Sequence, residues 1–219
     1  MSCLKKIHEK TPSAFPNSLG LFDLPPTNVA FTNTGFRAIL CSNPVTDEPY
    51  SFRVFSDNLW LDLSKTYVQL EFSISSYDST TKQYVKVTSD SIAPIQLIGN
   101  TFFRQLKISL NNTEVFDSGT LYPYRCYLTS ELSCATRTKM TELGAAGYYS
   151  LKKHNIKSDE GFVIANELAK NDTIQTFARL DFDLGNQPLL LLNNTDVVFT
   201  LYKAPDSFLI QSLDKVDCK

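Results

Sequence analysis

Short stretches of strict alternation between apolar and polar residues constrain the fold of this chain more than any other feature. The clearest is TYVQLEFSIS at residues 66–75, where Val68, Leu70, Phe72 and Ile74 fall on one side. A period of two is typical of a strand with one buried and one hydrated face. Roughly eight to ten short strands are expected in all. The other stretches are residues 35–40, 50–56, 59–63, 82–88, 102–110, 173–184, 195–204 and 206–212.

The strand pattern predicts an all-β fold. Turn residues bound most stretches, and strands do not alternate regularly with helices, so we expect an antiparallel jelly-roll β-sandwich with one or two short helices in loop excursions. Residues 82–88 are predicted to pair with 66–75, and the Asn-Asn pair after residue 110 is predicted to form a tight turn. The expected domains are an extended N-terminal arm at 1–28, a single jelly-roll domain at 29–212 and a C-terminal tail at 213–219.

One stretch, LYPYRCYLTSEL at residues 121–132, breaks the strand pattern. Its apolar side chains Tyr124, Leu128 and Leu132 have the spacing of one helix face. Pro123 suits the first turn of a helix, where its missing N–H has no partner to lose. We therefore predict a helix that docks this apolar face onto the sandwich.

The remainder of the middle region carries weaker signals. A second short helix is predicted at residues 138–143. Gly144 follows it, and glycine is a favourable residue just after the end of a helix. Residues 144–172 have the least pattern, and we expect long loops there.

Composition excludes several classes of function. The formal net charge is -2, which argues against a nucleic-acid coat and against direct sequence-specific binding of nucleic acid. The longest apolar run, Leu189–Leu192, is far too short to span a membrane, so no membrane association is expected. Five scattered cysteines suggest free thiols in a reducing compartment.

Few residues suggest chemistry. The two histidines, His8 and His154, stand in no recognised catalytic frame. Asp181 and Asp183 would share one strand face, where paired carboxylates can bind calcium or act as acid and base, although a hydrated face is the favoured interpretation. We expect neither an enzyme nor a cofactor or metal. A cupin-type enzyme in particular needs a histidine-rich metal cluster.

The segment GNTFFRQLKISLNNTEVFDSGTLYPYRCYLTSEL at 99–132 resembles the signature region of the major capsid proteins of Polinton/Maverick elements, in the double jelly-roll lineage. In that family a strand reading roughly Ser-Leu-Phe-x-Gln-Val-x-Val-x-Leu-Asn precedes a Tyr-Pro-Tyr-Arg-x-Tyr helix. The matching residues here are Phe103, Gln105, Leu110, Asn111, Tyr122, Pro123, Tyr124, Arg125 and Tyr127.

Three further segments resemble the family in the expected order. They are LFDLPPTN at 21–28, WLDLSKTYVQLEFSI at 60–74 and TDVVFTLYKAPDSFLI at 195–210. The resemblance extends over nearly all of residues 17–212 and is weakest at 135–172. The family carries two jelly rolls in one chain, and this chain ends where the first should end. A fragment, a decayed copy and a protein whose partner supplies the second half all fit this departure.

The resemblance implies a structural capsid protein. It implies self-assembly into trimeric capsomers of a virus-like shell, with a second jelly roll or other capsid proteins as partners. The expected location is the virion capsid, after synthesis inside the host cell. A non-enzymatic jelly-roll binding module, lectin-like or derived from a domesticated or decayed capsid copy, is the alternative function.

Apolar residues near the last long strand suggest where such a module would touch its partner. Residues 195–204 are apolar on both faces, and only one face can fill the core of a sandwich. The predicted interface residues are Leu189, Leu190, Leu191, Leu192, Val198 and Tyr202.

Overall fold

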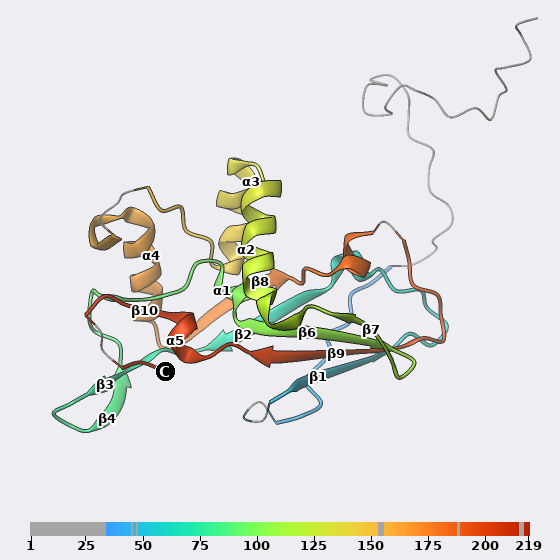
Figure 1. Cartoon of the computed structure of the whole chain (residues 1–219), viewed down its shortest axis with the longest axis horizontal. Coiled ribbons are helices and arrows are strands. Elements are labelled where there is room, and N and C mark those ends of the chain that lie inside the picture. The colour runs from blue at the N-terminus through green and yellow to red at the C-terminus, as the bar shows by residue number, and fades with distance from the viewer. Residues whose placement is uncertain (1–33, 45, 47, 153–155, 188, 215–216) are drawn as a thin grey trace, which may run out of the picture. The chain divides into compact units, whose positions relative to one another are not determined.

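A computed structural model of the chain describes residues 34–44, 46, 48–152, 156–187, 189–214 and 217–219. The chain divides into two compact units, of which the first ends at Ala38 and the second begins at Ile39. The second unit holds several antiparallel sheets and a few short helices (Figure 1). This arrangement is consistent with a β-sandwich and confirms the coarse fold class expected from the alternating sequence.

The largest sheet has four antiparallel strands in the order β1-β9-β6-β7. Its strands are β1 (Tyr50–Phe55), β9 (Asp196–Lys203), β6 (Phe103–Leu110) and β7 (Thr113–Asp117). Along β9, Val197, Phe199 and Leu201 are buried while the residues between them are only partly covered. The alternation in the sequence therefore marks the two faces of the central strand of this sheet.

A second antiparallel pair shares the core of the large sheet. It joins β2 (Tyr67–Phe72) to β8 (Ile174–Arg179). Val68 of β2 and Ala178 of β8 belong to the same buried cluster as Leu106 and Phe199 of the large sheet. This cluster is the main hydrophobic core, and its burial is the chief source of stability for the unit.

Two smaller strand pairs complete the described sheets. One joins β5 (Ile92–Pro94) to β10 (Ile210–Ser212), and the other joins β3 (Ser75–Asp78) to β4 (Gln83–Lys86). The end of the chain extends the second pair: Ser75 N donates to Lys219 O at 2.8 Å, and Tyr77 N donates to Asp217 O at 2.8 Å. Residues 217–219, predicted to be a tail, thus hydrogen-bond along β3.

Short helices fill the connections between the strands. The α-helices are α1 (Ile98–Thr101), α2 (Tyr122–Ser133), α3 (Thr136–Thr141), α4 (Glu160–Ala169) and α5 (Asp206–Leu209). The 3-10 helices are η3 (Leu63–Lys65), η4 (Gly119–Leu121), η5 (Leu143–Ala146), η6 (Ile156–Ser158) and η7 (Asp183–Asn186). Helices α2 and α3 rise side by side from the sheets (Figure 1).

Several local expectations are confirmed. Asn111 and Asn112 have φ values of 48° and 66° and turn β6 into β7, because asparagine tolerates the left-handed region. The predicted helix at 121–132 is α2, and its start at a buried Pro123 matches the expected first turn. The expected pairing of residues 82–88 with 66–75, however, is wrong, because β4 pairs with β3 and β2 pairs with β8.

Other expectations are wrong. Residues 59–63 form no strand, since only Leu61 makes a bridge, to Leu191. Residues 35–40 are irregular, and the stretch at 206–212 begins as helix α5 before β10. The loops expected at 144–172 contain helix α4, which the Asp159 side chain caps by accepting a hydrogen bond from Gly161 N at 2.9 Å.

The alternation of β6 is offset by a bulge. Its register with β9 shifts between Phe103 and Gln105, so Phe103 and Leu106 are both buried although three positions separate them. Phe102, the first residue of the predicted strand at 102–110, is only partly buried. The predicted arm at residues 1–28, with its LFDLPPTN segment, and both histidines lie outside the described residues.

Candidate functional site

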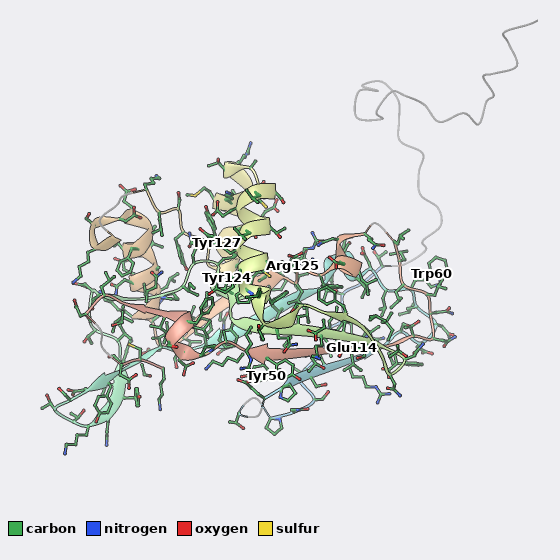
Figure 2. All side chains as sticks on the ribbon, in the orientation of Figure 1. Tyr50, Trp60, Glu114, Tyr124, Arg125 and Tyr127 are labelled. Carbon is green, nitrogen blue, oxygen red and sulfur yellow. The ribbon has the colours of Figure 1, made fainter. Side chains whose placement is uncertain are left out.

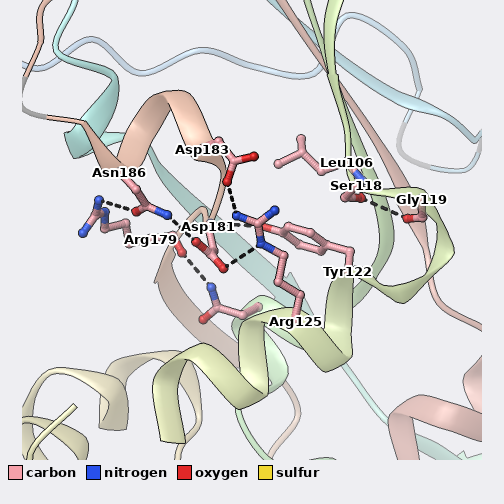
Figure 3. A network of polar contacts seen from close by, with 10 residues as sticks. Leu106, Ser118, Gly119, Tyr122, Arg125, Arg179, Asp181, Asp183 and Asn186 are labelled. Atoms are coloured by element: carbon pink, nitrogen blue, oxygen red, sulfur yellow. Dashed lines mark hydrogen bonds and ion pairs between the residues drawn. The ribbon is translucent and has the colours of Figure 1, made fainter. Parts of the chain in front are cut away.

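The residues of the Tyr-Pro-Tyr-Arg segment meet β6, β7 and the end of β8 in one polar and aromatic cluster (Figure 3). Tyr122 begins α2 and is fully buried in the main core with Phe103. Its hydroxyl oxygen accepts a hydrogen bond from Asp181 N at 3.1 Å, and burial raises the pKa of the phenol well above its usual range. Tyr122 thus fixes the start of the helix to the segment after β8.

Arg125 lies one helical turn beyond Tyr122 and binds two carboxylates. Its guanidinium Nη2 is 2.6 Å from Asp183 Oδ1, and its Nε is 3.4 Å from Asp181 Oδ2. The same guanidinium lies over the ring of Phe116 on β7, 5.5 Å from the ring centroid. Arg125 therefore joins α2, β7 and η7 through one side chain.

The Asp181 carboxylate is fully engaged by the chain itself. Its other oxygen accepts a hydrogen bond from Asn186 Nδ2 at 2.7 Å, and the Asn186 side-chain oxygen in turn accepts one from Arg179 at 3.1 Å. Asn100 of α1 donates to the Arg179 carbonyl at 2.6 Å. This chain of hydrogen bonds connects α1, the end of β8 and η7 to Arg125.

The expectation that Asp181 and Asp183 lie on a strand is wrong, since β8 ends at Arg179 and Asp183 opens η7. Phe182 between them is nevertheless extended, with φ -155° and ψ 154°, so both carboxylates lie on the same side and face Arg125 (Figure 3). The arginine occupies both carboxylates and offsets one of their two negative charges, so the pair stabilises the fold instead of offering an open site for a calcium ion.

Gln105 secures the other side of the cluster. Its Nε2 donates to Asp117 Oδ1 at 2.7 Å, and that carboxylate also accepts from Gly119 N at 2.8 Å. These hydrogen bonds, led by the one from Gln105, lower the pKa of Asp117. Ser118 Oγ accepts from Leu106 N at 2.9 Å. The β6–β7 hairpin is therefore hydrogen-bonded to the segment that begins η4, and η4 leads directly into α2.

The face of α2 that was predicted to dock onto the sandwich is exposed instead. Tyr124 and Leu128 are each 55% exposed and Leu132 is 85% exposed, whereas Tyr122, Pro123 and Cys126 are buried. Tyr124 packs edge-on against Phe208 of α5, with ring centroids 5.6 Å apart, and Tyr127 is 38% exposed (Figure 2). The apolar stripe of the helix points away from the core.

The predicted interface residues occupy two places. In the segment before β9, Leu189 and Leu192 are exposed, while Leu190 and Leu191 are partly covered. On β9, Val198 and Tyr202 are partly covered on the face opposite to the core.

The segment before β9 makes a backbone contact, whereas β9 makes a side-chain contact on its outer face. Leu191 exchanges backbone hydrogen bonds with Leu61 in both directions, at 3.0 and 2.8 Å. Arg104 lies over the Tyr202 ring at 5.7 Å from the centroid. The role of all six residues as an interface stays a prediction.

Residues with metal-binding chemistry do not gather within the described part of the chain: no group of three or more histidine, cysteine, aspartate or glutamate side chains could hold an ion there. Cys41, Cys126 and Cys134 are free thiols. Burial raises the pKa of Cys126 to about 12. Among the described helices, none has the length and apolar character to cross a bilayer.

Sequence reasoning missed the partners of the signature residues. It singled out Gln105 and Arg125 but did not link them to Asp117, Asp181 or Asp183. The sequence offered two separate signals, an arginine in a predicted helix and a pair of carboxylates without an assigned role. It did not show that they are close in space, because Arg125 and Asp183 are 58 residues apart in the chain.

Comparison with known proteins adds one relative. No family model matches the chain. The chain is 26% identical over 194 residues to "Uncharacterized protein F54H12.2" of Caenorhabditis elegans. The match covers 86% of this chain but 46% of the relative, so the chain spans less than half the length of that protein. The described geometry and this similarity establish an antiparallel β protein with a relative in a nematode.

Proposed function

We propose that the chain is a jelly-roll module of a capsid-type structural protein that self-associates into a virus-like shell. The resemblance of residues 99–132 to the Polinton/Maverick major capsid proteins implies this role, with trimeric capsomers as the expected assembly. The proposal is supported by how the strands pair, by what the signature residues contact and by which apolar surfaces are left uncovered.

Strand pairing supports a jelly roll. Strand β1 pairs with β9 in the large sheet, and β2 pairs with β8 in another, all antiparallel. The first pair encloses the second in the sequence, as happens when a long antiparallel ribbon folds over into two facing sheets. Both pairs also contribute side chains to one core.

The observation that carries the proposal is that four of the signature residues hold the fold together. Phe103 and Tyr122 fill the core, Gln105 binds Asp117, and Arg125 binds the carboxylates beside β8. Each has a structural partner within the chain. Such a set is what a shell protein needs, since its function is to present a rigid surface to its neighbours.

Exposed apolar residues supply surfaces for association. Leu189 and Leu192 lie uncovered before β9, and Trp60 is more than half exposed. Monomeric proteins rarely leave large contiguous apolar patches uncovered. We expect the Leu189–Leu192 segment and the outer face of β9 to contact either a second jelly roll or another copy of this chain.

The proposal is tested by the mass and shape of the purified chain. Light scattering coupled to gel filtration, with negative-stain microscopy, should detect concentration-dependent oligomers, including trimers, and no closed shell from residues 1–219 alone. A strictly monomeric chain at high concentration, unchanged by a candidate second jelly-roll protein, would contradict the proposal. Regular closed particles from this chain alone would show that a second half is not needed.

A further inference from the structure

Helix α2 carries its apolar stripe on the side opposite to its anchor. The stripe consists of Leu121, Tyr124, Leu128 and Leu132, at spacings of three, four and four residues. At about 100° per residue these four positions lie within roughly one quarter of the helix circumference. Each is more than half exposed. The contacts that hold α2 to the body come from the other side, through Tyr122, Pro123 and Cys126.

The charged residues of α2 are already paired within the chain. Only Arg125 and Glu131 are charged between Tyr122 and Ser133. Arg125 binds its two carboxylates, and the Glu131 carboxylate accepts a hydrogen bond from Lys139 of α3. The charged residues beside the stripe are therefore already paired within the chain, and a partner surface for the stripe should be apolar.

The area of the stripe is sufficient for an interface. Together with the partly exposed Tyr127, the stripe exposes on the order of 500 Å² of side chain, near the upper end for a monomer. Contact between two such stripes would bury on the order of 1,000 Å² in total, which is the lower bound for a specific interface. If the stripe bound a different protein, that protein would have to offer an apolar surface of the same area.

We propose that the apolar stripe of α2 is a self-association surface that packs against the same stripe of a second copy of this chain. Its apolar residues repeat almost evenly about a point between Tyr124 and Leu128, so two helices running in opposite directions place like against like. The contact is isologous and buries Leu128 near its centre. This inference rests on the proposed self-association and adds a two-fold contact through α2 to the surfaces already proposed, the Leu189–Leu192 segment and the outer face of β9.

The test compares charge substitutions at equally exposed positions. Leu128→Glu places a charge at the centre of the stripe, and Leu132→Glu places one toward its end. Thr129→Glu adds the same charge to another exposed position of α2, and Ile164→Glu adds it to an apolar residue of α4 that is 53% exposed. All four side chains are exposed, so each variant should fold, which circular dichroism and thermal melting would verify.

Sedimentation equilibrium would measure the dissociation constant between copies. We expect Leu128→Glu and Leu132→Glu to raise it at least about 30-fold, because a central apolar contact is replaced by a buried unpaired charge. The two control variants should change it less than about threefold. Self-association that survives both stripe variants would overturn this inference while leaving the proposed function intact. A wild-type chain that stays monomeric at all concentrations would overturn both.

Discussion

Arg125 shows how a single side chain can define the position of a helix. Its guanidinium contacts Asp183, Asp181 and the face of Phe116, which lie in two segments of the chain outside α2. The Asp181 side chain is only 14% exposed and depends on this arginine for its charge balance. A lysine could not make the same set of contacts, because it lacks the planar fork that reaches two carboxylates at once.

Replacement of Arg125 by alanine is expected to destabilise the fold. Asp181 would lose its cationic partner in a mostly buried position, and we expect the free energy of unfolding to fall by roughly 1–2 kcal/mol. The control is Lys86→Ala, which removes an exposed pair with Asp172 and should cost below about 0.5 kcal/mol. Urea denaturation of both variants measures the difference. Equal losses would contradict a special role for Arg125.

Cys126 is expected to be the least reactive of the described thiols. Burial raises its pKa to about 12, so at pH 8 almost none of it is the thiolate that reacts. Cys134 is partly exposed and should label well before Cys126 with a thiol reagent, as peptide mass spectrometry would detect. Labelling of Cys126 in the native protein at the rate of Cys134 would contradict its burial.

The raised pKa of Cys126 also sets a pH dependence of stability. The unfolded thiol loses its proton near its ordinary value of 9.0, whereas the folded thiol keeps it to about 12. The contribution of this thiol to the free energy of unfolding is therefore complete below pH 9. It is lost as the pH rises from 9 to 12, and the loss is about 1 kcal/mol at pH 10. Urea denaturation of the wild type and of Cys126→Ala at pH 8 and 10 would isolate this contribution.

At the scale of elements, helix α4 shows that a helix can form where no alternation is visible. Phe162, Ala165 and Ala169 are buried at spacings of three and four residues, and Asp159 caps the start. Asn166 secures the helix by donating to the carbonyl of Ile92 at 2.7 Å. The signal was present in the sequence as a capping aspartate before a run of helix-forming residues.

Adjacent residues of α4 offer a sharp test of its packing. Phe162 is buried and Val163 is 44% exposed. We expect Phe162→Ala to lower the free energy of unfolding by roughly 3–5 kcal/mol and Val163→Ala to lower it by less than about 0.5 kcal/mol. Thermal or urea unfolding would measure both. Similar effects at the two positions would mean that α4 does not pack through Phe162.

The strands that could be predicted are those that contribute to the main core. Local alternation identified β1, β2, β6, β8 and β9, because the residues that pack toward the core recur at every second position along most of each strand. It could not identify partners, since β2 pairs with β8 across about a hundred residues of chain. It also assigned the apolar stripe of α2 to the core, because periodicity identifies an apolar face without stating what covers it. The Arg125 cluster depends on such long-range neighbours and was missed for that reason.

At the scale of the whole described unit, the end of the chain takes part in the structure of β3 and β4. Residues 217–219 hydrogen-bond along β3. Tyr84 of β4 donates its hydroxyl to Asp217 at 3.0 Å, and the Lys219 ammonium lies 4.1 Å from the centroid of the same ring. Three chain segments thus form one small sheet, although the sequence alone suggested only a hairpin there.

Removal of residues 217–219 is expected to expose the edge of β3. The amides of Ser75 and Tyr77 would lose their acceptors and should exchange with deuterium much faster, while amides of β9 keep their protection as an internal control. Hydrogen exchange followed by mass spectrometry measures both regions in one experiment. Unchanged protection at Ser75 and Tyr77 would contradict the observed pairing.

The position of β9 between β1 and β6 has a consequence for synthesis on the ribosome. Arg53 and Asp196, which pair across β1 and β9, are 143 residues apart in the chain. At about 5–20 residues per second, β1 waits on the order of ten seconds or more after it is made before its neighbour is translated. During that time the β6–β7 hairpin can already form, because its contacts are local. The nascent chain therefore holds an incomplete sheet with open edges, a natural substrate for chaperones, until β9 inserts between the two waiting strands.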